Sequence, residues 1–196
     1  AARHVETYFQ VWQDAWRRVT EPGGLPRWRS VISPKCLLGT LELTLTPRTL
    51  SAARQALDKA RKAARGSGIY ARRVKWLANG MRLTELVARA VREIIAIEDM
   101  GLPLLYPAPW LRPNYDFDFV KTIMVGQVER RVLAHACDRA VAAIDEAVAF
   151  GESVEQKDPA CLGPEIARRL RKPAGFGRMR EILVQVAKLA RQKSPP

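Results

Sequence analysis

The stretch from Thr46 to Met100 constrains the fold most, because its apolar residues follow the pattern of two long amphipathic helices joined by a glycine turn. Thr46 is a suitable N-cap residue, and Pro47 fits the first helical position, where its missing N–H costs nothing. After this cap, apolar residues recur at intervals of three and four and share one helical stripe: Leu50, Ala53, Leu57, Ala60 and Ala64. The pattern therefore predicts a helix that begins at Pro47.

Gly66-Ser67-Gly68 interrupts this helix, and a second helix is expected from near Tyr70 onward. Proline is absent until Pro103, and the apolar positions of this helix are Val74, Leu77, Met81, Val87, Val91, Ile94 and Ile95. Two long helices with a short connection pack antiparallel. Gly80 lies inside the second helix, where it costs up to about 1 kcal/mol relative to alanine, and a close helix–helix contact there would explain its presence.

The rest of the chain also has helical periodicity, interrupted by loops rich in proline and glycine. A first helix is expected at 3–20, with one apolar face in the core that carries Val5, Tyr8, Phe9, Trp12, Ala15, Trp16 and Val19. A helix capped by Asp116 or Asp118 is expected to end at Gly151, before a polar loop at 152–163. A short basic helix at 165–172 and a last helix at 178–192 follow, and residues 31–45 are expected to be extended chain or a short helical turn. The fold class is therefore all-α, a single bundle of five to six helices with long Pro-rich connections, over a domain 1–193 with a frayed tail 194–196.

The chain of 196 residues carries a net charge of +13, and its pI is about 10.3. A surface this basic attracts nucleic acid, anionic lipid or acidic polysaccharide. The excess of arginine over lysine also follows from a GC-rich genome, so composition leaves both explanations open. No apolar run approaches the roughly 20 residues of a membrane-spanning helix. The start at Ala1, without an initiator Met, predicts a fragment of a larger chain.

No pattern in the sequence predicts a catalytic residue, a cofactor or a metal site. The three cysteines Cys36, Cys137 and Cys161 form no CxxC pair, and they are expected to be small buried residues, although one disulfide with a free thiol stays open. His4 and His135 lack neighbours at metal-ligand spacing. Paired carboxylates at Asp116 and Asp118 are better explained as helix caps than as a glycosidase pair.

The basic residues are the stronger binding candidates. Between Thr46 and Thr84 the sequence holds a single acid, Asp58, and ten basic residues: Arg48, Arg54, Lys59, Arg61, Lys62, Arg65, Arg72, Arg73, Lys75 and Arg82. If six of them share one face, they could bind nucleic acid or another polyanion: Arg61, Lys62, Arg65, Arg72, Arg73 and Lys75. Solvated helix faces are the alternative, and no zinc finger, RNP signature or helix-turn-helix supports nucleic-acid binding.

Two segments of the first half also resemble a known family. An opening helix carries Tyr8-Phe9 with Trp12 and Trp16, and Leu45-Thr46-Pro47 then starts a helix of the form Leu-x-x-Ala-Arg-x-x-Leu-x-x-Ala. Further on comes Arg73-Val74-x-Trp76-Leu77-x-x-Gly80-x-x-x-Thr84-Glu85. This half of the chain resembles the α-helical C-terminal domain of large bacterial glycoside-hydrolase-like proteins of uncharacterised function, in which it follows a barrel related to α-glucuronidases and hexosaminidases.

The resemblance implies a non-catalytic accessory domain of an exported or periplasmic carbohydrate-processing protein. The partner would be the upstream catalytic barrel of the same parent chain, and the domain would pack on this barrel or shape its cleft. Because the catalytic carboxylates of such proteins lie on the barrel, the resemblance assigns no catalytic residue here. The apolar segment 102–111 would then contact the barrel, and four loop aromatics would be candidates for stacking on polysaccharide: Trp28, Tyr106, Trp110 and Tyr115.

Overall fold

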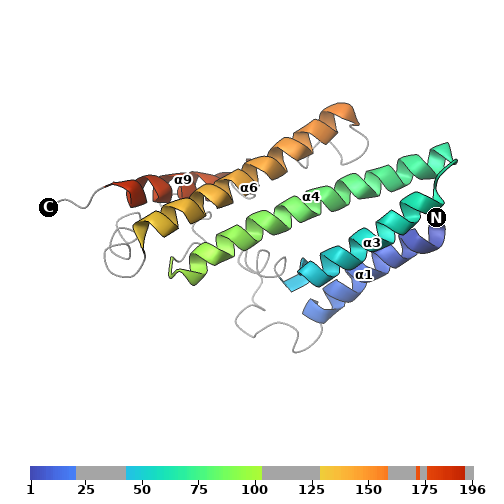
Figure 1. The fold of residues 1–196 in the computed structure, drawn as a ribbon, viewed down its shortest axis with the longest axis horizontal. Helices are drawn as coiled ribbons and strands as arrows, with labels where there is room; N and C mark the ends of the chain where they lie inside the picture. Colours follow the sequence, from blue (N-terminus) through green and yellow to red (C-terminus); the bar gives the residue numbers. More distant parts are fainter. Residues whose placement is uncertain (21–42, 103–128, 159–170, 173–175, 193–196) are drawn as a thin grey trace. The chain divides into compact units, whose positions relative to one another are not determined.

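The computed structural model describes residues 1–20, 43–102, 129–158, 171–172 and 176–192. Five helices make up most of this part of the chain, and no β-strand occurs in it, so the all-α prediction is confirmed. The helices are α1 (Ala2–Thr20), α3 (Pro47–Ala63), α4 (Gly68–Asp99), α6 (Arg130–Lys157) and α9 (Gly177–Arg191) (Figure 1). Of the uncertain segment 31–45 only the end is described, and Leu43 and Thr44 are helical there.

The start of α3 follows the prediction from its sequence. Thr46 has extended backbone angles, and its side chain accepts a hydrogen bond from the backbone N–H of Thr49 at 3.2 Å. Pro47 occupies the first helical turn. All five predicted stripe residues of α3 are buried, from Leu50 to Ala64. A polar cap and a periodic stripe are thus sufficient to define this helix.

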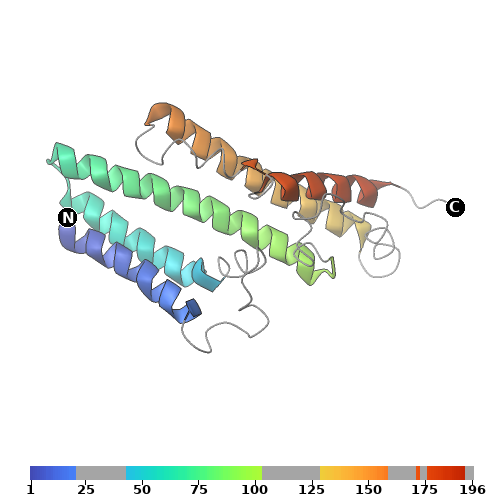
Figure 2. The ribbon, with the colours of Figure 1, turned by 180° about the vertical axis from the view of Figure 1, so that it is seen from behind.

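The turn between α3 and α4 depends on Gly66, whose φ of +88° lies in the left-handed region that favours glycine. The hairpin is antiparallel, because Ala60 and Ala64 near the end of α3 pack with Val74 near the start of α4. Helix α1 lies along the hairpin with its first residues against the same cluster, and α1, α3 and the first part of α4 run side by side in both views (Figures 1 and 2).

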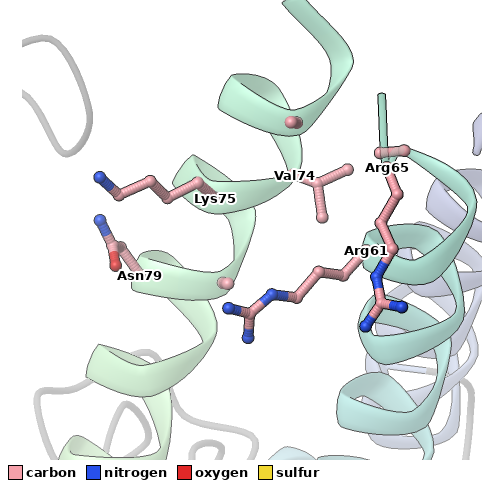
Figure 3. A pocket seen from close by; sticks show the side chains of 8 residues that line it. Arg61, Arg65, Val74, Lys75 and Asn79 are labelled. Atoms are coloured by element: carbon pink, nitrogen blue, oxygen red, sulfur yellow. The ribbon is translucent and has the colours of Figure 1, made fainter. Parts of the chain in front are cut away.

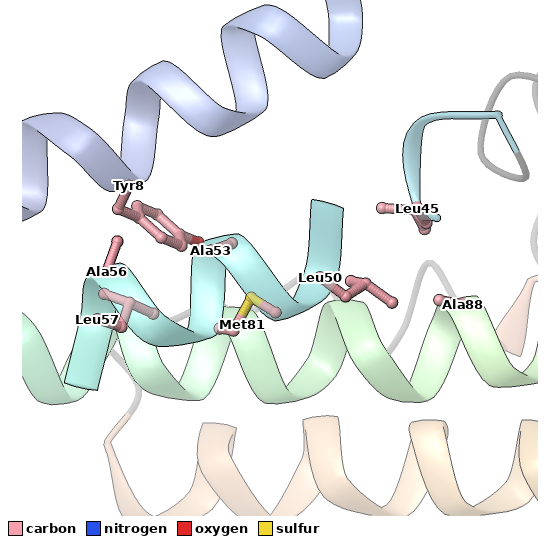
Figure 4. Packing of buried hydrophobic residues seen from close by; sticks show 8 residues of the cluster. All are labelled: Tyr8, Leu45, Leu50, Ala53, Ala56, Leu57, Met81 and Ala88. Carbon is pink, nitrogen blue, oxygen red and sulfur yellow. The ribbon is translucent and has the colours of Figure 1, made fainter. Parts of the chain in front are cut away.

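Figure 4 shows the larger core cluster of these three helices, in which Tyr8 of α1 faces Ala53 and Ala56 of α3. Met81 and Ala88 bring α4 into the same cluster, and Trp12 and Leu77 pack against it. Small residues of α3 allow the aromatic ring of Tyr8 to approach the helix closely. Arg54 of α3 also donates a hydrogen bond from Nε to Glu85 Oε1 of α4 at 2.7 Å.

The chain divides into two compact units: residues 1–88 with 154–163, and residues 89–153 with 164–196. In the second unit, Arg89 contacts Glu146 at 2.8 Å and Glu93 contacts Arg139 at 3.0 Å, so α4 and α6 run antiparallel. The predicted stripe of α9 is buried, at Met179, Ile182, Leu183, Val186 and Ala190. The expectation of a single domain 1–193 stays a prediction.

Helix α6 corrects the prediction of a helix that ends at Gly151. The helix continues through Gly151 to Lys157, so residues 152–157 are helical rather than a polar loop. Gly151 and Val154 are both buried, and they extend a stripe that includes Ala140, Ile144 and Ala147. A glycine costs about 1 kcal/mol in a helix, whereas burial of a valine side chain contributes about 1.5–3 kcal/mol. The packing therefore outweighs the helix-breaking tendency of glycine.

Gly80 provides a second correction. The prediction placed a close helix–helix contact at this position, but a Cβ added to Gly80 would meet no atom within 4 Å outside the backbone of its own helix. The side chain of Thr84 donates a hydrogen bond to the carbonyl oxygen of Gly80 at 2.9 Å. Packing therefore does not require glycine here.

Two aromatic residues of α1 depart from the expected core face. Phe9 is 49% exposed and Trp16 is 57% exposed, whereas Tyr8, Ala15 and Val19 are buried. Phe9 and Trp16 lie at the edge of the apolar stripe, about 80–100° around the helix from Tyr8 at 100° per residue. Helix α1 thus buries a narrower face than its sequence predicted.

Candidate binding surface

The α3–α4 hairpin ends in a cluster of exposed basic residues, all within about two and a half helical turns of Gly66. We call them the tip cations: Arg61, Lys62, Arg65, Arg72, Arg73 and Lys75. Across the described part of the chain, none of the six forms an ion pair or a side-chain hydrogen bond. Like charges within a few residues repel one another, and an anion would relieve this repulsion. The tip cations are therefore available for a ligand.

Three tip cations line one pocket of about 600 Å³ between α3 and α4. Arg61 and Arg65 contribute from α3, Lys75 and Asn79 from α4, and Val74 forms part of the apolar wall. Figure 3 shows Arg61 extending from α3 toward α4, whereas Lys75 and Asn79 extend beside each other from α4. The charged nitrogens of Arg61, Arg65 and Lys75 point in different directions (Figure 3). The pocket is therefore suited to an extended anionic chain rather than to one enclosed phosphate.

A second concavity lies between α1 and α4, on the other flank of α4. This groove of about 410 Å³, here called the aromatic groove, shares Val74 with the first pocket and is lined by side chains that include Glu6, Phe9, Tyr70, Arg73 and Leu77. Tyr70 is 53% exposed. The tip cations therefore flank α4 on both sides and do not all belong to one pocket.

The sequence did not predict the aromatic groove. The tip cations follow from the shortage of acids around them, but the groove requires knowledge that the start of α1 packs beside the start of α4. The only available signal was the position of Phe9 at the edge of the apolar stripe of α1. An aromatic residue at a stripe edge has one ring face available to a partner.

Arg54 differs from the tip cations because it forms an ion pair, with the carboxylate of Glu85. The side chain of Glu85 is only 13% exposed and contacts both Arg54 and Arg82. The hydrogen bond and negative charge of Glu85 raise the pKa of Arg54 above its usual value. Arg54 is therefore part of the framework, in contrast to the tip cations.

The described residues hold no group of three or more His, Cys, Asp or Glu side chains that could bind a metal ion. His135 is exposed on α6. Cys137 is a free, fully buried thiol, and burial together with the charge of Asp138 raises its pKa to about 12. A thiol with this pKa is a poor nucleophile at neutral pH. Cys36, Cys161, Asp116 and Asp118 lie outside the described residues.

The four loop aromatics predicted to stack on sugar also lie outside the described residues: Trp28, Tyr106, Trp110 and Tyr115. Of the apolar segment 102–111, the structure describes only Leu102, which is fully buried. The proposed roles of these residues stay predictions.

Comparisons with protein-family models, curated proteins and solved structures found no match for the chain. Among the described helices, none combines the length and apolar character needed to span a membrane.

Proposed function

We propose that this chain is a non-catalytic helical accessory module of a larger carbohydrate-processing protein, and that it packs on or shapes the cleft of an upstream catalytic barrel. The support comes from the positions of the residues that carry the family resemblance. Arg54 belongs to the first resembling segment and Glu85 to the second, and their side chains form a hydrogen-bonded ion pair between α3 and α4. The two segments are thus coupled as parts of one framework.

Other residues of the resemblance also have structural roles. Thr46 caps α3, Val74 is buried, and the indole N–H of Trp76 donates to Asp158 Oδ2 at 2.8 Å. These residues cap, pack and cross-link the helices, so they stabilise the fold and none of them is required for a reaction. This distribution favours a structural role for the resembling half of the chain.

The direct test is to read the coding frame upstream of Ala1 and to express the parent protein whole. We expect a barrel-encoding segment upstream, glycoside hydrolysis by the parent, and no hydrolysis by the isolated 196-residue chain. A frame that opens next to Ala1, or hydrolysis by the isolated chain, would contradict the proposal.

The tip cations favour a second candidate function, binding of nucleic acid or another polyanion. Six exposed cations without carboxylate partners provide the charge for such binding, whose affinity falls steeply with salt. Titration of the chain with a single-stranded oligonucleotide and with heparin at two salt concentrations tests this function. Binding that is absent at low salt would exclude it.

A further inference from the structure

We propose that the aromatic groove between α1 and α4 is a binding site for a carboxylate-bearing polysaccharide, and that the tip cations hold the flanking acidic sugars. This inference rests on the proposed carbohydrate-related function, and it assigns to that function a ligand class and a site on this chain. The site is formed by Phe9 and Tyr70, by Arg73, and by Glu6, with Leu77 and Val74 as further apolar lining.

The two rings provide apolar surface that the fold itself does not use. Phe9 is 49% exposed and Tyr70 is 53% exposed, and both line a groove whose volume is in the range of small-ligand sites. The ring of Phe9 is held by an edge-to-face contact with buried Tyr8, at a centroid distance of 5.3 Å and an interplanar angle of 71°. A ring fixed in this way loses little freedom when a ligand stacks on it.

The polar lining matches the chemistry of an acidic sugar. A pyranose ring has an apolar face of C–H groups that can lie on an aromatic ring, and its hydroxyl groups donate and accept hydrogen bonds. Arg73 has no carboxylate partner in the described structure, and its guanidinium can bind a sugar carboxylate with two parallel hydrogen bonds. Glu6 can accept hydrogen bonds from hydroxyl groups.

The carboxylate of Glu6 favours an acidic glycan over a DNA strand at this groove. Glu6 needs a hydrogen-bond donor from the ligand, and a DNA strand carries a phosphate at every nucleotide but no sugar hydroxyl group within the chain. An acidic glycan presents hydroxyl groups as well as carboxylates on each sugar. Arg61, Arg65 and Lys75 line the pocket on the other flank of α4, so they can contact carboxylates where the glycan continues past α4.

The experiment measures binding of the complete 196-residue chain to polygalacturonate and to its fully methyl-esterified form, which has the same backbone without the charge. We expect binding to the acid form and at least a tenfold weaker affinity for the ester, because the ester offers arginine no charged acceptor. Tyr70→Ser and Arg73→Gln are each expected to lower affinity for polygalacturonate about tenfold.

The control variants are Val132→Ser and Arg131→Gln, which remove an exposed apolar residue and an exposed cation from α6. They should leave the affinity unchanged. Circular dichroism of each variant checks that the helices are intact. Tyr70→Phe, which keeps the aromatic ring, should bind polygalacturonate with an affinity close to that of the unchanged chain.

Three results would overturn the inference. Equal affinity for the acid and the ester would show that the sugar carboxylates do not contribute to binding. Unchanged affinity in Tyr70→Ser and Arg73→Gln would show that the aromatic groove is not the binding site. Tighter, Tyr70-dependent binding of oligothymidylate than of polygalacturonate would make the groove a nucleic-acid site. Each result leaves the accessory-module proposal intact, because that proposal is tested by the parent protein and its upstream frame.

Discussion

The basic residues at the α3–α4 tip differ from several arginines of the second unit, which are neutralised by a carboxylate. The six tip cations have no acidic partner in the described part of the chain. In the second unit, Arg180 donates to Asp145 from Nε at 2.6 Å and from a terminal nitrogen at 2.9 Å, and Arg139 contacts Glu93 at 3.0 Å. Part of the basic charge behind the net +13 is therefore neutralised by carboxylates, whereas the charge at the tip is not. A basic composition indicates a binding surface only where the acids are missing.

The largest effect is expected from removal of three tip cations. A variant with Arg61→Gln, Arg65→Gln and Lys75→Gln should lower affinity for a single-stranded oligonucleotide by about tenfold or more at low salt. The slope of log affinity against log salt should become shallower by up to about 2, since each lost cation–phosphate contact removes about 0.7 for a single strand. Filter binding at several salt concentrations measures both quantities.

The matched control removes the same charge elsewhere, with Arg131→Gln, Lys172→Gln and Lys188→Gln, three exposed positions of the second unit. Its affinity and salt slope should stay near those of the unchanged chain. If the two triple variants lost affinity equally, the tip would not be a distinct binding surface, because total charge rather than location would then determine binding.

Glu85→Gln should have the next largest effect, on stability. Its side chain is mostly buried and contacts two arginines, so loss of its charge should lower the free energy of unfolding by about 1–3 kcal/mol. The same change leaves Arg54 without its carboxylate and should slightly raise affinity for a polyanion. Thermal unfolding measures the first effect and oligonucleotide titration the second; an unchanged Tm would show that the pair contributes nothing.

Gly80→Ala should stabilise the chain by up to about 1 kcal/mol, because the added methyl group meets open space and alanine favours the helix. Gly66→Ala provides the contrast, since the φ of +88° at Gly66 is strained for alanine and the variant should be destabilised. Denaturant unfolding of both variants measures the difference. A loss of stability in Gly80→Ala would instead indicate that another helix lies close to this position.

The smallest effect is expected from Asp145→Asn, which removes the carboxylate partner of Arg180. Both side chains are about half exposed, so the free energy of unfolding should fall by no more than about 1 kcal/mol. The hydrogen bond and charge of Asp145 raise the pKa of Arg180, and Arg180 stays protonated in the variant. If this newly unpaired cation raised oligonucleotide affinity as much as a tip cation does, the position of the tip would be unimportant.

Local sequence signals were sufficient for the start of α3 and for the core stripe of α9. Thr46 and Pro47 act within one helical turn, and the burial of Ile182 and Val186 follows from helical spacing alone. Such signals depend on residues a few positions apart, so no tertiary information is needed to interpret them.

The remaining features depend on contacts between distant residues. Gly151 has a helix-breaking preference that buried Val154 overrides, and the extent of Phe9 burial depends on how α1 lies beside α4. For the same reason, the sequence predicts the tip cations but not the groove between Phe9 and Tyr70. A shortage of acidic residues can be recognised in the sequence, whereas a groove between two helices cannot.

The division into two compact units has a consequence for how the protein melts. The polypeptide passes between the units inside α4, after Ala88, and again inside α6, after Ser153. Each of these helices is one continuous ladder of backbone hydrogen bonds with residues in both units. Loss of either unit would expose the apolar stripe of a helix that the other unit still holds, so the two halves should lose their structure in one cooperative transition.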